Sequence, residues 1–193
     1  MADATFWLAN GKTITVELLP EAAPNTCASF VWAVKHHIYD GHQIQRIVPG
    51  KWVDLSYDAF GKEEAKYLIP SEFTLHPELK PLPVAAGSIC MGGYGDMGLA
   101  GCEVFFPLTD QPQLTGTYPV FGRVKSGFDE IKRLGSVPTR PVTDFPYEGV
   151  EVNEPIEPQV IERVSLNPAD FDLPAPVRMT HGQLPLTWQS NNP

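Results

Sequence analysis

The sequence contains little of what several common classes of protein require. Its three cysteines, Cys27, Cys90 and Cys102, are odd in number and form no Cys-x-x-Cys pair. We therefore expect buried free thiols and no disulfide framework. Basic residues are also scarce, since 14 lysines and arginines stand against 23 acids, for a formal net charge of −9. This balance argues against nucleic acids and anionic membrane surfaces as partners.

Long apolar runs are absent as well. No stretch reaches the roughly 20 apolar residues that cross a bilayer, and "MADATFWLANGK" has neither a basic start nor a sustained apolar run. We therefore expect a cytoplasmic protein with no membrane partner. A chain of 193 residues buries about two-thirds of its unfolded surface, so its stability requires no metal or other cofactor.

Two periodic patterns of apolar residues occur near the start of the chain. In "TFWLANGKTITVELLP", Asn10-Gly11 separates two extended runs, and the second run alternates apolar with polar residues, which predicts a hairpin. In "AAPNTCASFVWAVKHHIYDG", apolar residues then recur at spacings of three and four. Pro24 suits a first helical turn and Gly41 suits a stop, so an amphipathic helix is expected here.

The later apolar segments are short and are bounded by Gly and Pro. We expect "HQIQRIV", "KYLIP", "AAGSICMG", "CEVFFPL", "YPVFGRV" and "PQVIERVSL" to be strands. A second helix is predicted in "SGFDEIKRLGS". Many short strands and two helices predict a mainly β fold, a closed barrel whose ends the helices cover.

Two segments are not expected to belong to the barrel. Residues 138–158, rich in Pro and acids, are expected to form a loop insertion that acts as an ordered loop or lid. Residues 167–193 form a Pro-rich tail with enough apolar side chains to dock on the domain (residues 1–166) or to mediate self-association with a neighbouring chain. These apolar residues are Leu173, Val177, Leu184, Leu186 and Trp188.

Several motifs together identify a family resemblance. "ITVELLPEAAPNTCASFVWAV", then "YDG" and "IQRIVPG", resembles the first third of a cyclophilin-type peptidyl-prolyl cis-trans isomerase. The later blocks "AAGSICMGGYG", "AGCEVFFPLTD" and "LTGTYPVFGRVKSGFD" follow in the family's order, so the resemblance runs from about Thr5 to Leu166. It suggests a divergent, bacterial-like member. It implies an eight-stranded antiparallel barrel capped by two α-helices, with proline-containing peptides or unfolded protein segments as partners.

The resemblance places Arg46 at the family's catalytic arginine. Rotation about a peptide bond must cross a barrier of about 18 to 20 kcal/mol, because it breaks the amide resonance. In the twisted state the prolyl nitrogen gains a lone pair, which a fixed guanidinium can stabilise by a hydrogen bond. The alternative is a structural arginine whose stem covers apolar surface while its head pairs with Asp54 or Glu103.

The other substrate-contacting positions of the family carry several changed residues. Alignment on "RIVPG" places the family's Phe-Met pair on Lys51 and Trp52 and its first Gln on Asp54. The remaining matches assign substrate contacts to Gly92, Gly93, Glu103, Phe105, Leu114 and Tyr118. Trp52 and Tyr118 are expected to replace aromatic walls, whereas Asp54 and Glu103 put carboxylates where the family has neutral amides. An acid beside the guanidinium would hold it in place and compete for its donors.

Two functions of different class follow from this pattern. The first is a peptidyl-prolyl isomerase that assists folding, with activity weakened by the altered pocket. The second is a cyclophilin-like peptide-binding or assembly module that has lost efficient turnover.

Three other interpretations have weaker support. "GYGDMG" at residues 93–98 matches a dinucleotide-binding motif but is not followed by a helical pattern. His36, His37 and His42 are poorly spaced for a metal site. Asp54 and Glu103 form a glycosidase pair only if their separation is suitable, which the sequence does not indicate.

Overall fold

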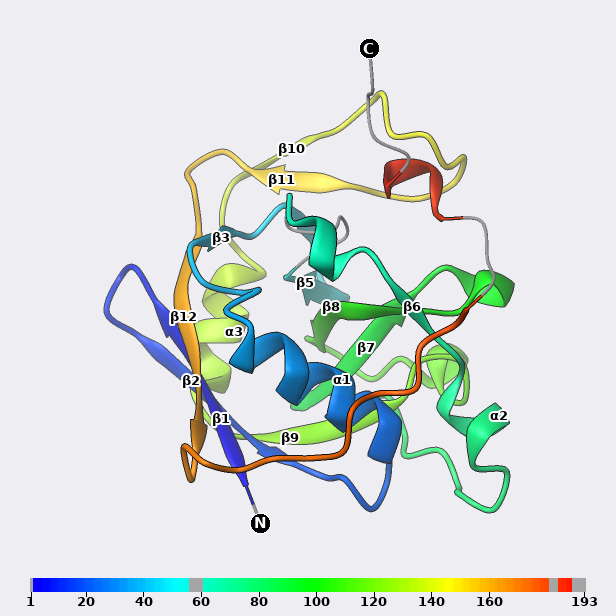
Figure 1. Cartoon of the computed structure of the whole chain (residues 1–193). Coiled ribbons are helices and arrows are strands. Elements are labelled where there is room, and N and C mark those ends of the chain that lie inside the picture. The colour runs from blue at the N-terminus through cyan, green and yellow to red at the C-terminus, as the bar shows by residue number, and fades with distance from the viewer. Residues whose placement is uncertain (1, 56–60, 181–183, 189–193) are drawn as a thin grey trace.

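All the strands that the structure describes belong to a single 12-stranded sheet. The structure is a computed structural model that describes residues 2–55, 61–180 and 184–188 (Figure 1). The strands are β1 (Asp3–Leu8), β2 (Thr13–Leu18), β3 (His42–Gln43), β4 (Arg46–Val48), β5 (Trp52–Asp54), β6 (Leu68–Ile69), β7 (Ser88–Gly93), β8 (Leu99–Pro107), β9 (Val120–Ser126), β10 (Thr139–Pro141), β11 (Asn153–Pro155) and β12 (Val160–Asn167). The helices are α1 (Pro24–Lys35), α2 (Glu72–Leu75) and α3 (Phe128–Leu134), with 3-10 turns η1 (Glu63–Ala65), η2 (Gly95–Met97), η3 (Pro112–Leu114) and η4 (Leu186–Trp188).

The sheet curls into a barrel that is not hydrogen-bonded all the way round. Its strand order is β10-β11-β4-β5-β8-β7-β9-β2-β1-β12-β3, with β6 paired to β8, and every pairing is antiparallel. Only residues 44 and 45 separate β3, at one end of this order, from β4, near the other end. The mainly β fold is thus confirmed, with a seam between β3 and β4 where the predicted barrel would close.

The predicted hairpin and both predicted helices are present. Gly11, in the turn between β1 and β2, has a φ of +79°, a conformation that favours glycine. Helix α1 begins at Pro24 as expected, but it ends at Lys35, before the predicted stop at Gly41. The earlier end follows from His37, whose φ of +55° is left-handed.

A cluster of aromatic rings fills the space between α1 and the sheet. Phe6 of β1 contacts Phe30 of α1, Tyr39 and Phe106 of β8 with ring centroids 5.6–6.3 Å apart. All four rings are fully buried. Cys27, Cys90 and Cys102 are also buried and free, as predicted. None of the helices in the described residues is long and apolar enough to span a bilayer.

The Pro-rich segment at residues 138–158 contains more regular structure than a loop. β10 pairs with the neighbouring β11, and β11 joins the main sheet through Asn153, opposite Ile47 of β4. β10 is an edge strand, which tolerates Pro141 because its outer side needs no ladder hydrogen bond.

The tail lies along the protein's own domain. It passes beside α1 and reaches the β10–β11 region at η4 (Figure 1). Asn25 exchanges two hydrogen bonds with the Val177 backbone, and the Arg178 guanidinium lies 4.3 and 3.6 Å from the ring centroids of Trp32 and Tyr67. Trp188 is buried in a cluster with Leu68 and Ala100. These contacts fix the described tail residues on the barrel.

A buried carboxylate caps the start of α1. The residue before the helix, Ala23, has no side-chain acceptor, so the first backbone N–H groups of α1 need a partner from elsewhere. Glu72 of α2 accepts from the Asn25 N–H (3.1 Å), the Thr26 N–H (2.7 Å) and the Thr26 hydroxyl (2.6 Å). Its negative charge also complements the positive end of the helix dipole. A short helix distant in sequence therefore completes α1.

We expect Glu72→Ala to lower the free energy of unfolding by about 2 to 4 kcal/mol, because three buried donors lose a charged acceptor. Urea unfolding followed by circular dichroism measures this loss. The matched control is Glu64→Ala, an exposed acid, which should change stability by less than about 0.5 kcal/mol. Equal effects of the two substitutions would contradict the capping role.

Candidate functional site

One pocket of about 350 Å³ brings together all nine residues that the sequence predicts for the site. They are Arg46, Trp52, Asp54, Gly92, Gly93, Glu103, Phe105, Leu114 and Tyr118. The pocket forms here because β4, β5, β8 and β7 are successive neighbours in the sheet. Side chains two residues apart share one face of a strand, so Trp52 and Asp54 point the same way. Glu103 and Phe105 do so on β8.

The first half of the pocket is an apolar wall. The Trp52 and Phe105 rings have centroids 6.0 Å apart, and Tyr118 meets Phe105 edge-on at 5.8 Å. Leu114 packs against the same cluster, and η3 places it one turn before Tyr118, whose N–H donates to the Leu114 carbonyl. Burial raises the pKa of Tyr118, an effect that Arg46 partly offsets. This half can enclose a small apolar ring and exclude water from it.

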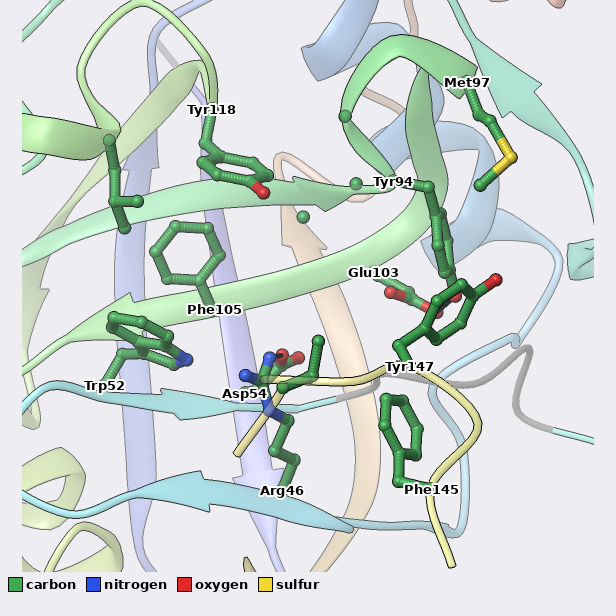
Figure 2. Close-up of a pocket in the computed structure, with 15 residues that line it drawn as sticks. Arg46, Trp52, Asp54, Tyr94, Met97, Glu103, Phe105, Tyr118, Phe145 and Tyr147 are labelled. Carbon is green, nitrogen blue, oxygen red and sulfur yellow. Dashed lines mark hydrogen bonds and ion pairs between the residues drawn. The ribbon is translucent and has the colours of Figure 1, made fainter. Parts of the chain in front are cut away.

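Arg46 lies beside this wall, next to Asp54 (Figure 2), and two contacts hold its guanidinium. Its Nη1 donates to Asp54 Oδ2 at 2.9 Å, and its Nε donates to the Glu151 carbonyl at 2.9 Å. The guanidinium carbon lies 5.7 Å from the Trp52 ring centroid, and the side chain is 16% exposed. Within the described part of the chain, the Nη2 hydrogens have no protein partner. The guanidinium is therefore held in place with donors left for a ligand.

From the sequence, Arg46 either lines a groove or pairs with an acid. In the structure it lines the pocket and also pairs with Asp54. Arg46 and Asp54 are direct cross-strand partners on β4 and β5. Both side chains are largely buried, at 16% and 11% exposure. A partly buried ion pair fixes the guanidinium more firmly than a neutral amide would, and it also offsets part of its positive charge.

The second predicted carboxylate has a different neighbour. Tyr94 donates its hydroxyl hydrogen to Glu103 Oε1 at 2.9 Å. Burial raises the pKa of Tyr94 far above its usual value, and Glu103 raises it further, so the phenol stays protonated and can donate. Each of the two carboxylates thus accepts a hydrogen bond from a different side chain that lines the pocket.

Gly92 and Gly93 bring backbone to the edge of the pocket. A Cβ on Gly93 would lie 3.0 Å from both the Gly98 carbonyl oxygen and the Leu99 Cα. The register between strands β7 and β8 shifts at this point, where the two backbones lie close together. A larger residue at position 93 would therefore require movement of backbone, which explains the glycine at this position.

The second half of the pocket was not predicted from the sequence. It is lined by Tyr94, Met97, Phe145, Tyr147 and Val150. Tyr94 and Met97 follow β7 directly, so their nearness to Gly93 was a usable signal. Phe145 and Tyr147 belong to the loop between β10 and β11, and their only signal was two aromatic residues within a Pro-rich, acidic segment.

The structure gives the histidines and the glycine motif local roles. The three histidines have separate partners: His36 contacts the Trp32 carbonyl, His37 contacts Asp40 and His42 contacts the Leu55 carbonyl. Within the described residues, no three His, Cys, Asp or Glu side chains are grouped to hold a metal ion. The "GYGDMG" motif includes η2, and the strand β8 follows it where a dinucleotide site would need a helix.

Comparisons with known proteins all indicate the same family. The model of the family "Cyclophilin type peptidyl-prolyl cis-trans isomerase/CLD" matches residues 6–164. The chain is 34% identical over 139 residues to "Peptidyl-prolyl cis-trans isomerase B" of Bacillus subtilis, covering 70% of this chain and 92% of that protein. It is 32% identical over 142 residues to "Peptidyl-prolyl cis-trans isomerase-like 1" of Aspergillus niger, covering 72% and 85%.

Solved structures agree on the fold. A cyclophilin-type isomerase of Cryptosporidium parvum aligns with a TM-score of 0.68 at 19% identity, covering 85% of this chain and 96% of that chain. A structure of the same protein in the presence of the dipeptide Ala-Pro aligns with a TM-score of 0.66, again at 19% identity, covering 84% and 96%. Together with the family match over residues 6–164, these findings show that the chain belongs to the cyclophilin-type peptidyl-prolyl cis-trans isomerase family.

Proposed function

We propose that this protein isomerises Xaa-Pro bonds of peptides and unfolded protein segments, with Arg46 as its catalytic residue. The observation that carries the proposal is the anchored guanidinium of Arg46 beside an apolar wall of Trp52, Phe105, Leu114 and Tyr118. The wall would hold the proline ring. The guanidinium would face the amide next to it.

Catalysis in this arrangement requires no covalent step. As the peptide bond twists, its resonance is lost and the prolyl nitrogen becomes a hydrogen-bond acceptor. A donor of Arg46 stabilises this state more than the planar amide, whose nitrogen accepts poorly, and only such a difference lowers the barrier. The Asp54 and Glu151 contacts place the donor before the substrate binds, so little reorganisation is needed during the reaction.

One observation favours the alternative of a peptide-binding module with little turnover. The carboxylate of Asp54 occupies one Arg46 donor and offsets the charge that the twisted amide would feel. In this alternative the pocket binds proline-containing peptides, and the ion pair serves mainly to hold β4 on β5. The two functions differ in whether binding is accompanied by faster cis/trans exchange.

We expect Arg46→Ala to reduce kcat/KM for a short Xaa-Pro peptide by about a hundredfold or more, because a preorganised donor to the reacting atom is lost. Arg46→Lys should recover little of the rate, since an ammonium cannot keep both anchors while it also faces the substrate. NMR exchange spectroscopy measures the rate at equal protein concentrations. Arg140→Ala, an exposed arginine paired with Glu154, is the matched control and should be as active as the wild type.

Faster exchange by the wild type that disappears in Arg46→Ala supports the isomerase. Peptide binding by a folded wild type without faster exchange supports the binding module.

We expect Asp54→Asn to raise kcat severalfold, because an amide oxygen can still orient the guanidinium while offsetting less of its charge. Asp54→Ala should lower kcat, since it removes the anchor as well as the charge. Steady-state rates for the two variants, with their urea midpoints, separate these effects. An equal loss of activity in both would show that the ion pair itself is required for turnover.

The cytoplasm remains the predicted location. The buried, free state of Cys27, Cys90 and Cys102 fits a reducing compartment. Cell fractionation tests this prediction, and recovery in an oxidising compartment would contradict it.

Self-association through the tail also remains a prediction. The tail contacts its own barrel, yet Val177 and Leu186 keep 53% and 50% exposure and could contact a second copy. We expect light scattering to show a mass that rises with concentration, and Val177→Asp to reduce this rise. A constant monomer mass would rule out the association.

A further inference from the structure

The pocket continues past Arg46 into the second aromatic half. Figure 2 shows Trp52, Phe105 and Tyr118 to one side of Arg46 and Asp54, with Tyr94, Met97, Phe145 and Tyr147 to the other. The rings of Tyr94 and Tyr147 have centroids 6.2 Å apart, and those of Phe145 and Tyr147 are 5.7 Å apart. Three rings and a thioether therefore form a continuous apolar surface next to the proposed proline wall.

We propose that this second half, lined by Tyr94, Met97, Phe145, Tyr147 and Val150, is a specificity subsite for an aromatic or large aliphatic side chain of the substrate. The occupant is a residue near the isomerised Xaa-Pro pair in the same peptide. The proposal rests on the proposed isomerase function, and it adds the class of sequence that the protein prefers.

The chemistry of the lining selects an apolar side chain. The Tyr94 hydroxyl is bonded to Glu103, and the Tyr147 hydroxyl accepts the Leu186 N–H at 2.7 Å. With these polar groups partnered, the surface offered to a ligand is mainly ring faces and edges, which pack best against another apolar group. Met97 adds a side chain that adapts to occupants of different shape.

The subsite is built before any ligand arrives. The loop that carries Phe145 and Tyr147 is closed by the hydrogen bond from the Val142 N–H to the Val152 carbonyl, next to the β10–β11 pair. The Glu151 carbonyl ties the same loop to Arg46. On the far side, Trp188 of η4 packs edge-on against Tyr94 with ring centroids 5.4 Å apart. A wall held in place loses little entropy on binding.

The acidic neighbours of the loop aromatics disfavour acidic side chains of a substrate. Asp144 and Glu148 directly flank the stretch from Phe145 to Tyr147, and both are exposed. An acidic residue of a peptide would therefore meet like charges as well as an apolar lining. We infer that the subsite prefers Phe and Leu to Ala, and Ala to Glu.

The test uses alanine-based peptides with a single proline. Phe, Leu, Ala or Glu is placed in turn at each position from three before to three after the proline. Exchange rates are measured by NMR, and Kd is measured by titration of the same samples. We expect one position at which kcat/KM for Phe exceeds that for Ala by about tenfold, the usual size of an apolar-pocket effect, while Glu falls below Ala.

Variants then assign the preference to this wall. In the double variant Phe145→Ala, Tyr147→Ala the ratio of kcat/KM for the Phe peptide to kcat/KM for the Ala peptide should fall to within about twofold. Tyr147→Phe keeps the ring and should retain the preference. Thr143→Ala, an exposed residue of the same loop that does not line the pocket, is the matched control, and circular dichroism verifies folding of each variant.

The outcomes separate this proposal from the isomerase itself. Isomerisation of all peptides at one rate, or a Phe preference that survives the double variant, overturns the subsite and leaves the isomerase intact. Absence of faster exchange, with a Phe preference in Kd that the double variant removes, overturns the isomerase and supports the subsite. If the wild type neither accelerates exchange nor binds the peptides, both the isomerase and the subsite are overturned.

Discussion

The register in which β4 pairs with β5 positions the whole site. It sets Arg46 opposite Asp54, and the next pairing sets Asp54 opposite Phe105 of β8. Because side chains alternate between the two faces of a strand, a slip of one residue would turn the guanidinium away from the pocket and bring Ile47 out of the core. The ion pair favours the correct register as well as holding the arginine, so one contact links the stability of the sheet edge to the chemistry.

The two carboxylates that replace neutral amides of the family illustrate how environment decides a role. The sequence groups Asp54 and Glu103, since both are acids at positions expected to contact the peptide. In the structure Asp54 faces a guanidinium, whereas Glu103 accepts a hydrogen bond from the Tyr94 phenol. The first substitution acts directly on the proposed catalytic group. The second fixes the orientation of Tyr94 in the second half of the pocket.

Local patterns predicted the parts of the fold that depend on local physics. Alternation between Thr13 and Leu18, and the three-and-four spacing after Pro24, depend only on neighbouring residues. The site residues on β4, β5, β7 and β8 followed from motifs that keep a nearly fixed spacing. Phe145, Tyr147 and the cap from Glu72 were missed, because their positions depend on contacts between segments far apart in the chain. A periodic pattern of apolar residues carries no information about such contacts.

The path of the tail has a consequence for how the protein opens. Val177 is bonded to Asn25 near the start of α1, Arg178 lies against Trp32 and Tyr67, and Trp188 contacts Tyr94 at the pocket. A fluctuation that lifts all the described tail residues would break contacts with the helix and with the pocket wall. Helix and wall are thus expected to form one cooperative unit in hydrogen exchange, although they belong to distant parts of the sequence.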